Sequence, residues 1–167
     1  MYAPGRVLCV VLPAIVNIAE KDLLQPRLSR ALLTEAKEYI TRFTTPFSHV
    51  EFTNPIYETI TVKCSVKIKT GYDENYYGSQ LNKDIQQYLS PWILNKTKSP
   101  SFGGKIYASA IINFIEELEY IDYLTQFEAS KVENNKLVIW KEETSGSSEA
   151  VILTSALQHQ IDTNAIC

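Results

Sequence analysis

The run from Asn54 to Thr70 constrains the fold of this sequence more than any other stretch. From Ile60 onward, apolar and polar side chains alternate at every residue, which is the pattern of a β-strand with one buried face and one wet face. β-branched residues favour a strand here, and Pro55 stands at its start, where a missing backbone donor disturbs a sheet least. We therefore expect helices to cover the face formed by Ile60, Val62, Cys64, Val66 and Ile68. The companion face should be wet, with Thr61, Lys63, Ser65 and Lys67.

Shorter signals place the other elements around this strand. A valine-rich run closed by Pro13 predicts a strand buried on both faces, and Ser29 is a capping residue for a helix with regularly spaced apolar residues. Asn134-Asn135 predicts a tight hairpin turn, because asparagine tolerates a positive φ. The expected strands are 7–12, 49–53, 54–70, 121–128, 136–141 and 150–155. The expected helices begin near Pro26–Ser29, between Asp73 and Ser79, and after Gly104, and residues 142–149 are expected to form a flexible loop.

Up to residue 128 the order is strand, helix, strand, strand, helix pair, strand. This is the order of an α+β, two-layer ferredoxin-like (split βαβ) domain with a doubled second helix, in which the first and third strands are central and adjacent. The remaining residues add a C-terminal β-hairpin extension. We expect a ferredoxin-like domain over residues 1–130, followed by a hairpin and strand extension with a flexible end over residues 131–167.

The first strand creates a problem of cover, because Val7–Leu12 is apolar on both faces. Beside the long strand, half of its side chains would lie on the face away from the helices. Leaving three of them bare forgoes roughly 1.5–3 kcal/mol each. The hairpin of residues 123–141 is the favoured cover, with Leu137, Ile139 and Trp140 reaching across; preceding domains and another copy are the alternatives. We then expect this chain to be a monomer or a weak homo-oligomer.

Composition and charge exclude several classes of function. The 167 residues suffice for a proper core, and a net charge of −3 argues against binding nucleic acid. No stretch approaches the roughly 20 apolar residues that a membrane helix needs. Cys9, Cys64 and Cys167 lie far apart, which predicts reduced, buried thiols and no metal site. We expect a soluble protein that is cytoplasmic when made.

Residues with catalytic potential do not assemble into a motif. Phe102-Gly103-Gly104-Lys105 precedes a helix but lacks the GxxxxGK[ST] spacing, so we expect a tight turn and no phosphate site. His49 and His159 have no nucleophile motif and are interpreted as surface or capping residues. A solvated edge is expected for the acidic group Glu116, Glu117, Glu119 and Asp122, which lacks the spacing of a calcium loop. We therefore predict no catalytic residues, no cofactor and no metal.

Pro91-Trp92, directly after the second helix, is different in kind. A large indole beside a helix-ending proline is either a plug in the core or an anchor in a partner's pocket, and the sequence leaves both open. Truncating the side chain would destabilise the folded chain in the first case and weaken association in the second.

Several short segments between residues 50 and 130 stand in a specific order and spacing. They are Asn54-Pro55-Ile56-Tyr57, Leu81-Asn82-Lys83-Asp84-Ile85 with Leu89-Ser90-Pro91-Trp92, Phe102-Gly103-Gly104-Lys105-Ile106-Tyr107, and Tyr120-Ile121-Asp122-Tyr123. Together they resemble the baseplate J-like family of contractile phage tails and phage-tail-like injection systems, over roughly half of the chain. The candidate interface or family-motif residues are Asn54, Pro55, Tyr57, Pro91, Trp92, Phe102, Gly103, Gly104, Lys105 and Tyr107.

The resemblance implies a structural protein of the baseplate wedge, with other wedge, hub or sheath proteins as partners and no catalytic residues. The match is to the C-terminal part of a larger protein, so this sequence is expected to be a fragment or a shortened relative. A small-molecule-binding or regulatory ferredoxin-like domain is the alternative, because one fold hosts many functions. An enclosed apolar pocket would favour that alternative, and a broad exposed apolar patch would favour assembly.

Overall fold

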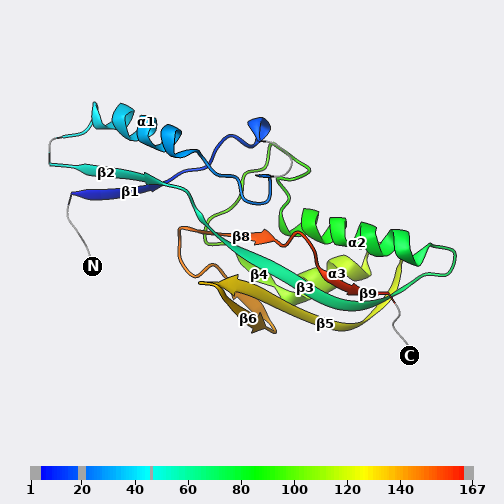
Figure 1. Ribbon diagram of the computed structural model, residues 1–167. Helices are drawn as coiled ribbons and strands as arrows, with labels where there is room; N and C mark the ends of the chain where they lie inside the picture. The colour runs from blue at the N-terminus through cyan, green and yellow to red at the C-terminus, as the bar shows by residue number, and fades with distance from the viewer. Residues whose placement is uncertain (1–4, 19–21, 46, 164–167) are drawn as a thin grey trace.

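β3, which runs from Ile56 to Ile68, is the central strand of the molecule (Figure 1). The computed structural model describes residues 5–18, 22–45 and 47–163. The predicted apolar face is confirmed, because all five of its residues are buried: Ile60, Val62, Cys64, Val66 and Ile68. On the other face Lys63 is exposed, and Thr61, Ser65 and Lys67 are half-buried.

The main sheet has five strands, arranged around β3. Its order is β6 (Lys136–Trp140), β5 (Ile121–Glu133), β3 and β8 (Val151–Ser155), and the short β9 (Gln160–Asp162) also pairs with β3. β5 and β6 run antiparallel to their neighbours, whereas β8 and β9 run parallel to β3. Asn134 and Asn135 form the predicted turn between β5 and β6, with φ angles of 48° and 60°.

Two helices cover the apolar face of the sheet. α2 (Glu74–Leu89) is capped at its N-terminus by Asp73, whose carboxylate accepts a hydrogen bond from the Tyr76 N–H at 2.7 Å. α3 (Ala108–Glu116) packs beside it. The helices bury Leu81, Ile85, Leu89, Ala108, Ile111 and Ile115, and these residues form the main core with the apolar face of β3. Tyr88 on α2 is exposed, and its ring stacks on that of Phe114 with centroids 4.3 Å apart.

The opposite face of the sheet carries a second, smaller core at its β8 end. Ile152 on β8 points to this side, and Trp92, Leu23 and Ile15 pack on it. Ile15 belongs to a single 3-10 turn, η1 (Ile15–Asn17). All five residues of β8 are buried, because the strand has cover on both faces.

The first strands and helix form a separate unit, which we call the arm. It consists of β1 (Arg6–Val10), α1 (Arg30–Thr41) and β2 (His49–Thr53), and β1 pairs with β2 in parallel. The Ser29 hydroxyl caps α1 as predicted, accepting a hydrogen bond from the Leu32 N–H at 3.3 Å. β2 leads almost directly into β3, and the arm projects from one end of the main sheet (Figure 1).

The structure is a mixed α+β protein, but the expected ferredoxin-like arrangement is not observed. β1 does not lie beside β3; it pairs with β2 in a two-stranded sheet of its own. The prediction that β1 is buried on both faces is wrong, since none of its residues is buried. The hairpin expected to cover it lies in the main sheet, with Leu137 and Ile139 exposed. An unbroken apolar run shows that a strand needs cover, but not which element supplies it.

The expected loop over residues 142–149 is also partly wrong. It contains β7 (Glu143–Ser145), which pairs with β4 (Lys105–Tyr107) just before α3. A hydrogen bond of 2.8 Å from the Ala108 N–H to the Glu142 carbonyl extends this pairing. β5 continues to Glu133, beyond the predicted end at Glu128. The division of the chain near residue 130 stays a prediction, and β5 runs across that point.

Candidate assembly surfaces

Two of the family-motif residues hold one segment, residues 23–28, which we call the strap. The side-chain amide of Asn54 accepts a hydrogen bond from the Leu28 N–H at 2.8 Å and donates one to the Leu28 carbonyl at 2.9 Å. The Tyr57 hydroxyl donates to the Pro26 carbonyl at 2.5 Å. Burial raises the pKa of Tyr57 well above its usual range, so the hydroxyl keeps the proton that it donates.

Trp92 holds the other end of the strap. Its indole Nε1–H donates to the Leu23 carbonyl at 2.7 Å, and the side chain is only 3% exposed. The structure therefore places Trp92 as a plug in the second core. Because the strap directly precedes α1, the side chains of Asn54, Tyr57 and Trp92 fix the position at which the arm leaves the main sheet.

The other family-motif residues lie elsewhere. Gly103 has a φ of 59° and its N–H donates to the Val151 carbonyl at 2.8 Å, while the Gly104 carbonyl accepts a hydrogen bond from the Gly146 N–H at 3.2 Å. The expected tight turn ahead of α3 is thus confirmed, since a positive φ suits glycine. Pro55 is buried and Pro91 half-buried, and the exposed members of this set are Phe102, Gly103, Lys105 and Tyr107.

Two more of the segments that carry the family resemblance, those that contain Asp84 and Tyr120, contact each other between α2 and β5. The Tyr120 hydroxyl donates to the Asp84 carboxylate at 2.6 Å, and the Tyr120 ring lies 4.7 Å from the ring of Tyr77. Burial and then this hydrogen bond raise the pKa of Tyr120. The contact joins the helix layer to the sheet and serves packing.

The arm presents the largest group of exposed apolar side chains. No residue of α1 is buried. Tyr39 and Phe43 contact each other with ring centroids 5.2 Å apart, yet they are 60% and 73% exposed. The exposed large apolar residues of the arm and of its α1–β2 connection are Val7, Leu8, Leu32, Tyr39, Phe43 and Phe47. A concentration of this kind on one small unit is typical of a protein–protein contact surface.

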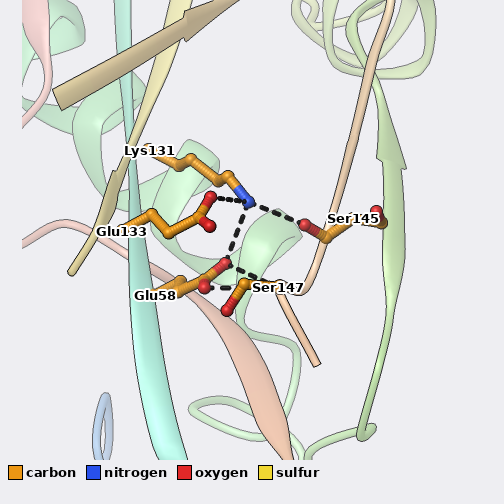
Figure 2. A network of polar contacts seen from close by, with 5 residues as sticks. All are labelled: Glu58, Lys131, Glu133, Ser145 and Ser147. Atoms are coloured by element: carbon orange, nitrogen blue, oxygen red, sulfur yellow. Dashed lines mark hydrogen bonds and ion pairs between the residues drawn. The ribbon is translucent and has the colours of Figure 1, made fainter. Parts of the chain in front are cut away.

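A buried ion pair ties three parts of the main body together (Figure 2). The Lys131 amine on β5 lies 3.1 Å from the Glu58 carboxylate on β3 and 2.8 Å from that of Glu133. It also donates to the Ser145 carbonyl at 2.9 Å, and the Ser147 N–H donates to both oxygens of Glu58 at 3.3 Å. Burial acts to lower the pKa of Lys131, but hydrogen bonds to Glu133 and Glu58 outweigh it and raise the pKa. This charged network anchors the segment after β7.

His159, which was interpreted from the sequence as a surface or capping residue, is buried. Its Nδ1 accepts a hydrogen bond from the Val62 N–H at 3.1 Å, so the ring proton sits on Nε2, 3.0 Å from the Ser155 hydroxyl. That hydroxyl in turn donates to the Ala156 carbonyl at 2.9 Å. Activation of a serine needs the opposite arrangement, with the imidazole accepting the hydroxyl proton. Burial lowers the pKa of His159 to about 4, so the ring is neutral and structural.

The described residues offer little for small molecules or metals. The hollows on the surface are open, with volumes of about 430, 620 and 510 Å³, and the first lies between α2 and the chain around His159. No three His, Cys, Asp or Glu side chains within the described ranges are placed to hold a metal ion. Burial raises the pKa of the Cys64 thiol to about 12, while Cys9 is half-buried and Cys167 lies outside the described residues.

Two further expectations concern the surface and the membrane. The acidic group at the end of α3 is solvated as expected, with Glu116, Glu117, Glu119 and Asp122 all exposed. Among the helices that the structure describes, none combines the length and the apolar character needed to cross a membrane.

Comparison with known proteins gives a matching family model and a similar solved structure. The family model described as baseplate protein PVC11-like matches residues 1–156. A chain in the cryo-EM structure of the anti-feeding prophage (AFP) baseplate, six-fold symmetrised, has a similar fold, with a TM-score of 0.59 and 16% sequence identity. That similarity covers 78% of this chain and 26% of the other, so this chain spans about a quarter of the length of its structural match. A comparison with curated proteins gives no match.

Proposed function

This chain belongs to the baseplate protein PVC11-like family, a family of structural proteins and not of enzymes, and from that membership we propose how it works in the particle. It is a protein–protein assembly module in the baseplate of a contractile, phage-tail-like injection system. It links wedge subunits to each other and to hub or sheath proteins, and it passes from the cytoplasm into the assembled particle. The family match over residues 1–156 carries the baseplate assignment.

The arm is the element through which the chain contacts a neighbouring baseplate subunit. The main support is that α1 has an apolar side but no buried residue. Covering an exposed leucine, tyrosine or phenylalanine contributes roughly 1.5–3 kcal/mol for each side chain. A two-stranded parallel sheet is also rare without further cover, because parallel sheets are usually buried on both faces. A neighbouring subunit that packs on the arm supplies the cover for its apolar side chains that the chain itself does not.

The strap gives this contact its geometry. Asn54, Tyr57 and Trp92 bind the backbone of the strap at three separate carbonyl groups, those of Leu28, Pro26 and Leu23. The arm is therefore held at a fixed position relative to the main sheet. A rigid arm suits a bracket, because a preorganised contact loses less conformational entropy on binding.

The test replaces exposed apolar side chains of α1 and of the turn after it, and follows assembly. The variant carries Leu32→Gln and Tyr39→Gln on α1 and Phe43→Gln in the turn that follows; the helix is retained because glutamine is a good helix former. We expect the variant to fold normally but to be missing from purified baseplates. The matched control carries Glu116→Gln, Glu117→Gln and Glu119→Gln, which alters an exposed edge of the main body. Assembly of the arm variant at the level of the control would overturn the arm as the contact surface.

The hollows that the described residues form do not favour the small-molecule alternative. The hollows are open and of mixed lining, whereas a binding site of this kind is a concave, mostly apolar cleft that encloses its ligand.

A further inference from the structure

The free edge of β6 is a second place where the chain is incomplete. We propose that this edge receives an extended segment of another baseplate protein, which adds a strand to the main sheet and is apolar in its centre and acidic at both ends. The proposal rests on the assembly function given above, but it concerns a different surface from the arm.

The edge itself is open. β6 is the last strand in the order of the main sheet, and within the described part of the chain it pairs with β5 alone. Along an antiparallel edge strand, every second residue directs its N–H and C=O groups away from the sheet. β6 closes a two-residue turn in which Glu133 faces Lys136. The outward positions are then Leu137 and Ile139.

Apolar side chains lie near this edge on the face of the sheet that points away from the helices, although that face is otherwise mostly polar. Leu137 and Ile139 are 66% and 56% exposed, and Leu137 lies opposite Val132, which is also exposed. Val138, on the other face, is exposed as well. An added strand would therefore gain backbone hydrogen bonds and apolar contacts on both faces. Open, apolar edge strands are otherwise an aggregation hazard that proteins avoid.

The charges at the two ends of β6 indicate which kind of segment fits this edge. Lys136 and Lys141 flank the apolar run, are exposed, and have no carboxylate partner among the described residues. Glu142 is next in sequence, but there the backbone has turned toward α3, where its carbonyl accepts from Ala108. Antiparallel pairing of two β6 strands, centred on Val138, would set Lys136 opposite Trp140 of the other copy and leave both lysines without a carboxylate. A strand with acidic ends supplies the carboxylates that a second copy lacks, so it fits better than a second copy.

The experiment uses the whole chain and three short peptides, followed by chemical shifts of the backbone amides. The first peptide has six residues, Glu-Thr-Val-Thr-Val-Glu, so that antiparallel pairing can set its two glutamates opposite Lys141 and Lys136 and its valines opposite Ile139 and Leu137. The second has lysine in place of both glutamates. The third keeps the glutamates but carries N-methyl groups on its backbone, which remove the donors that a new strand needs.

We expect the glutamate-ended peptide to bind about tenfold more tightly than the lysine-ended one, as two exposed ion pairs allow, and to shift amides of β5 and β6. The N-methylated peptide should not bind. In the chain with Lys136→Glu and Lys141→Glu, the preference should reverse. The variant Ile139→Lys, which alters an exposed side chain, should weaken binding at least tenfold without loss of folding.

Equal affinity for the two charged peptides, binding of the N-methylated peptide, or shifts confined to the arm would overturn the proposal. A homodimer that pairs through β6 would overturn it too, in favour of a second copy. The assembly function has its own readout, because the arm variants are followed in purified particles and not in peptide binding. Failure of the peptides together with loss of arm variants from particles would reject the β6 site and leave the proposed function standing.

Discussion

β1 and β8 are strands of the same length and similar apolar character, but their surroundings differ completely. Each has five residues and pairs in parallel with a neighbour, β1 with β2 and β8 with β3. Every residue of β8 is buried, and none of β1 is. β8 lies between the helix layer and the second core around Trp92, whereas β1, among the described residues, pairs with β2 in a two-stranded sheet apart from both cores.

This difference separates the part of the chain that completes its own fold from the part that does not. In the main body, apolar side chains find partners within the same chain. In the arm, comparable side chains such as Leu8 and Phe43 remain in solvent. We conclude that the burial that stabilises the chain lies mostly in the body, and this difference is the basis for the proposal that the arm contacts another subunit.

The largest expected effect compares one aromatic residue from each region. Trp92→Ala should lower the free energy of unfolding by roughly 3–5 kcal/mol, because it opens a cavity in the second core and leaves the Leu23 carbonyl without its donor. Phe43→Ala in the arm should change it by less than about 0.5 kcal/mol. Urea denaturation of both variants measures these changes. Similar losses for the two would remove the distinction between body and arm.

The buried ion pair gives the next largest effect. Lys131→Met leaves the Glu58 carboxylate buried without its cation and should cost about 3 kcal/mol or more. Adding Glu58→Leu to that variant should recover most of the loss, since an apolar pair of similar volume replaces the charges. The exposed pair of Lys105 and Glu143 serves as the control, and Lys105→Met should leave the urea midpoint unchanged. No recovery in the double variant would contradict the pairing shown in Figure 2.

Acid should weaken the main body through His159. The pKa of this residue is lowered to about 4 in the folded chain, against about 6.5 when unfolded. The unfolded chain therefore binds the proton first, and stability falls as the pH drops from about 6.5 toward 4. Between neutral pH and pH 4.5 the contribution is roughly 2.5 kcal/mol. His159→Gln should flatten this part of the pH profile and His49→Gln should not; equal profiles for both would contradict the assignment.

The sequence predicts the parts of the fold whose signals are local. The alternation in β3, the serine cap of α1 and the two asparagines of the β5–β6 turn act over a few residues. β7 could not be predicted in this way, because its order comes from β4 and from the anchoring of Ser145 and Ser147 by a distant ion pair. A signal for that ion pair does exist. Glu58 has the same parity as the apolar face of β3, so a carboxylate at that position needs a buried cation.

The candidate surfaces show the same limit. Asn54, Tyr57 and Trp92 were selectable from the sequence through a family resemblance, but their common role in holding the strap needs three-dimensional contacts. The apolar run of β1 predicts a strand buried on both faces, and the structure contradicts this prediction. The prediction fails because a buried strand and an exposed strand can have the same composition.

Hydrogen–deuterium exchange, measured on the free chain and on assembled baseplates, tests the central claim most directly. In the free chain, amides of β1 and α1 should exchange far faster than those of β3 and β8, since the arm has little burial to protect it. In the baseplate, the arm amides should become protected to a level near that of the body. Arm amides that are as protected as β8 in the free chain, or that stay unprotected in the particle, would contradict the account.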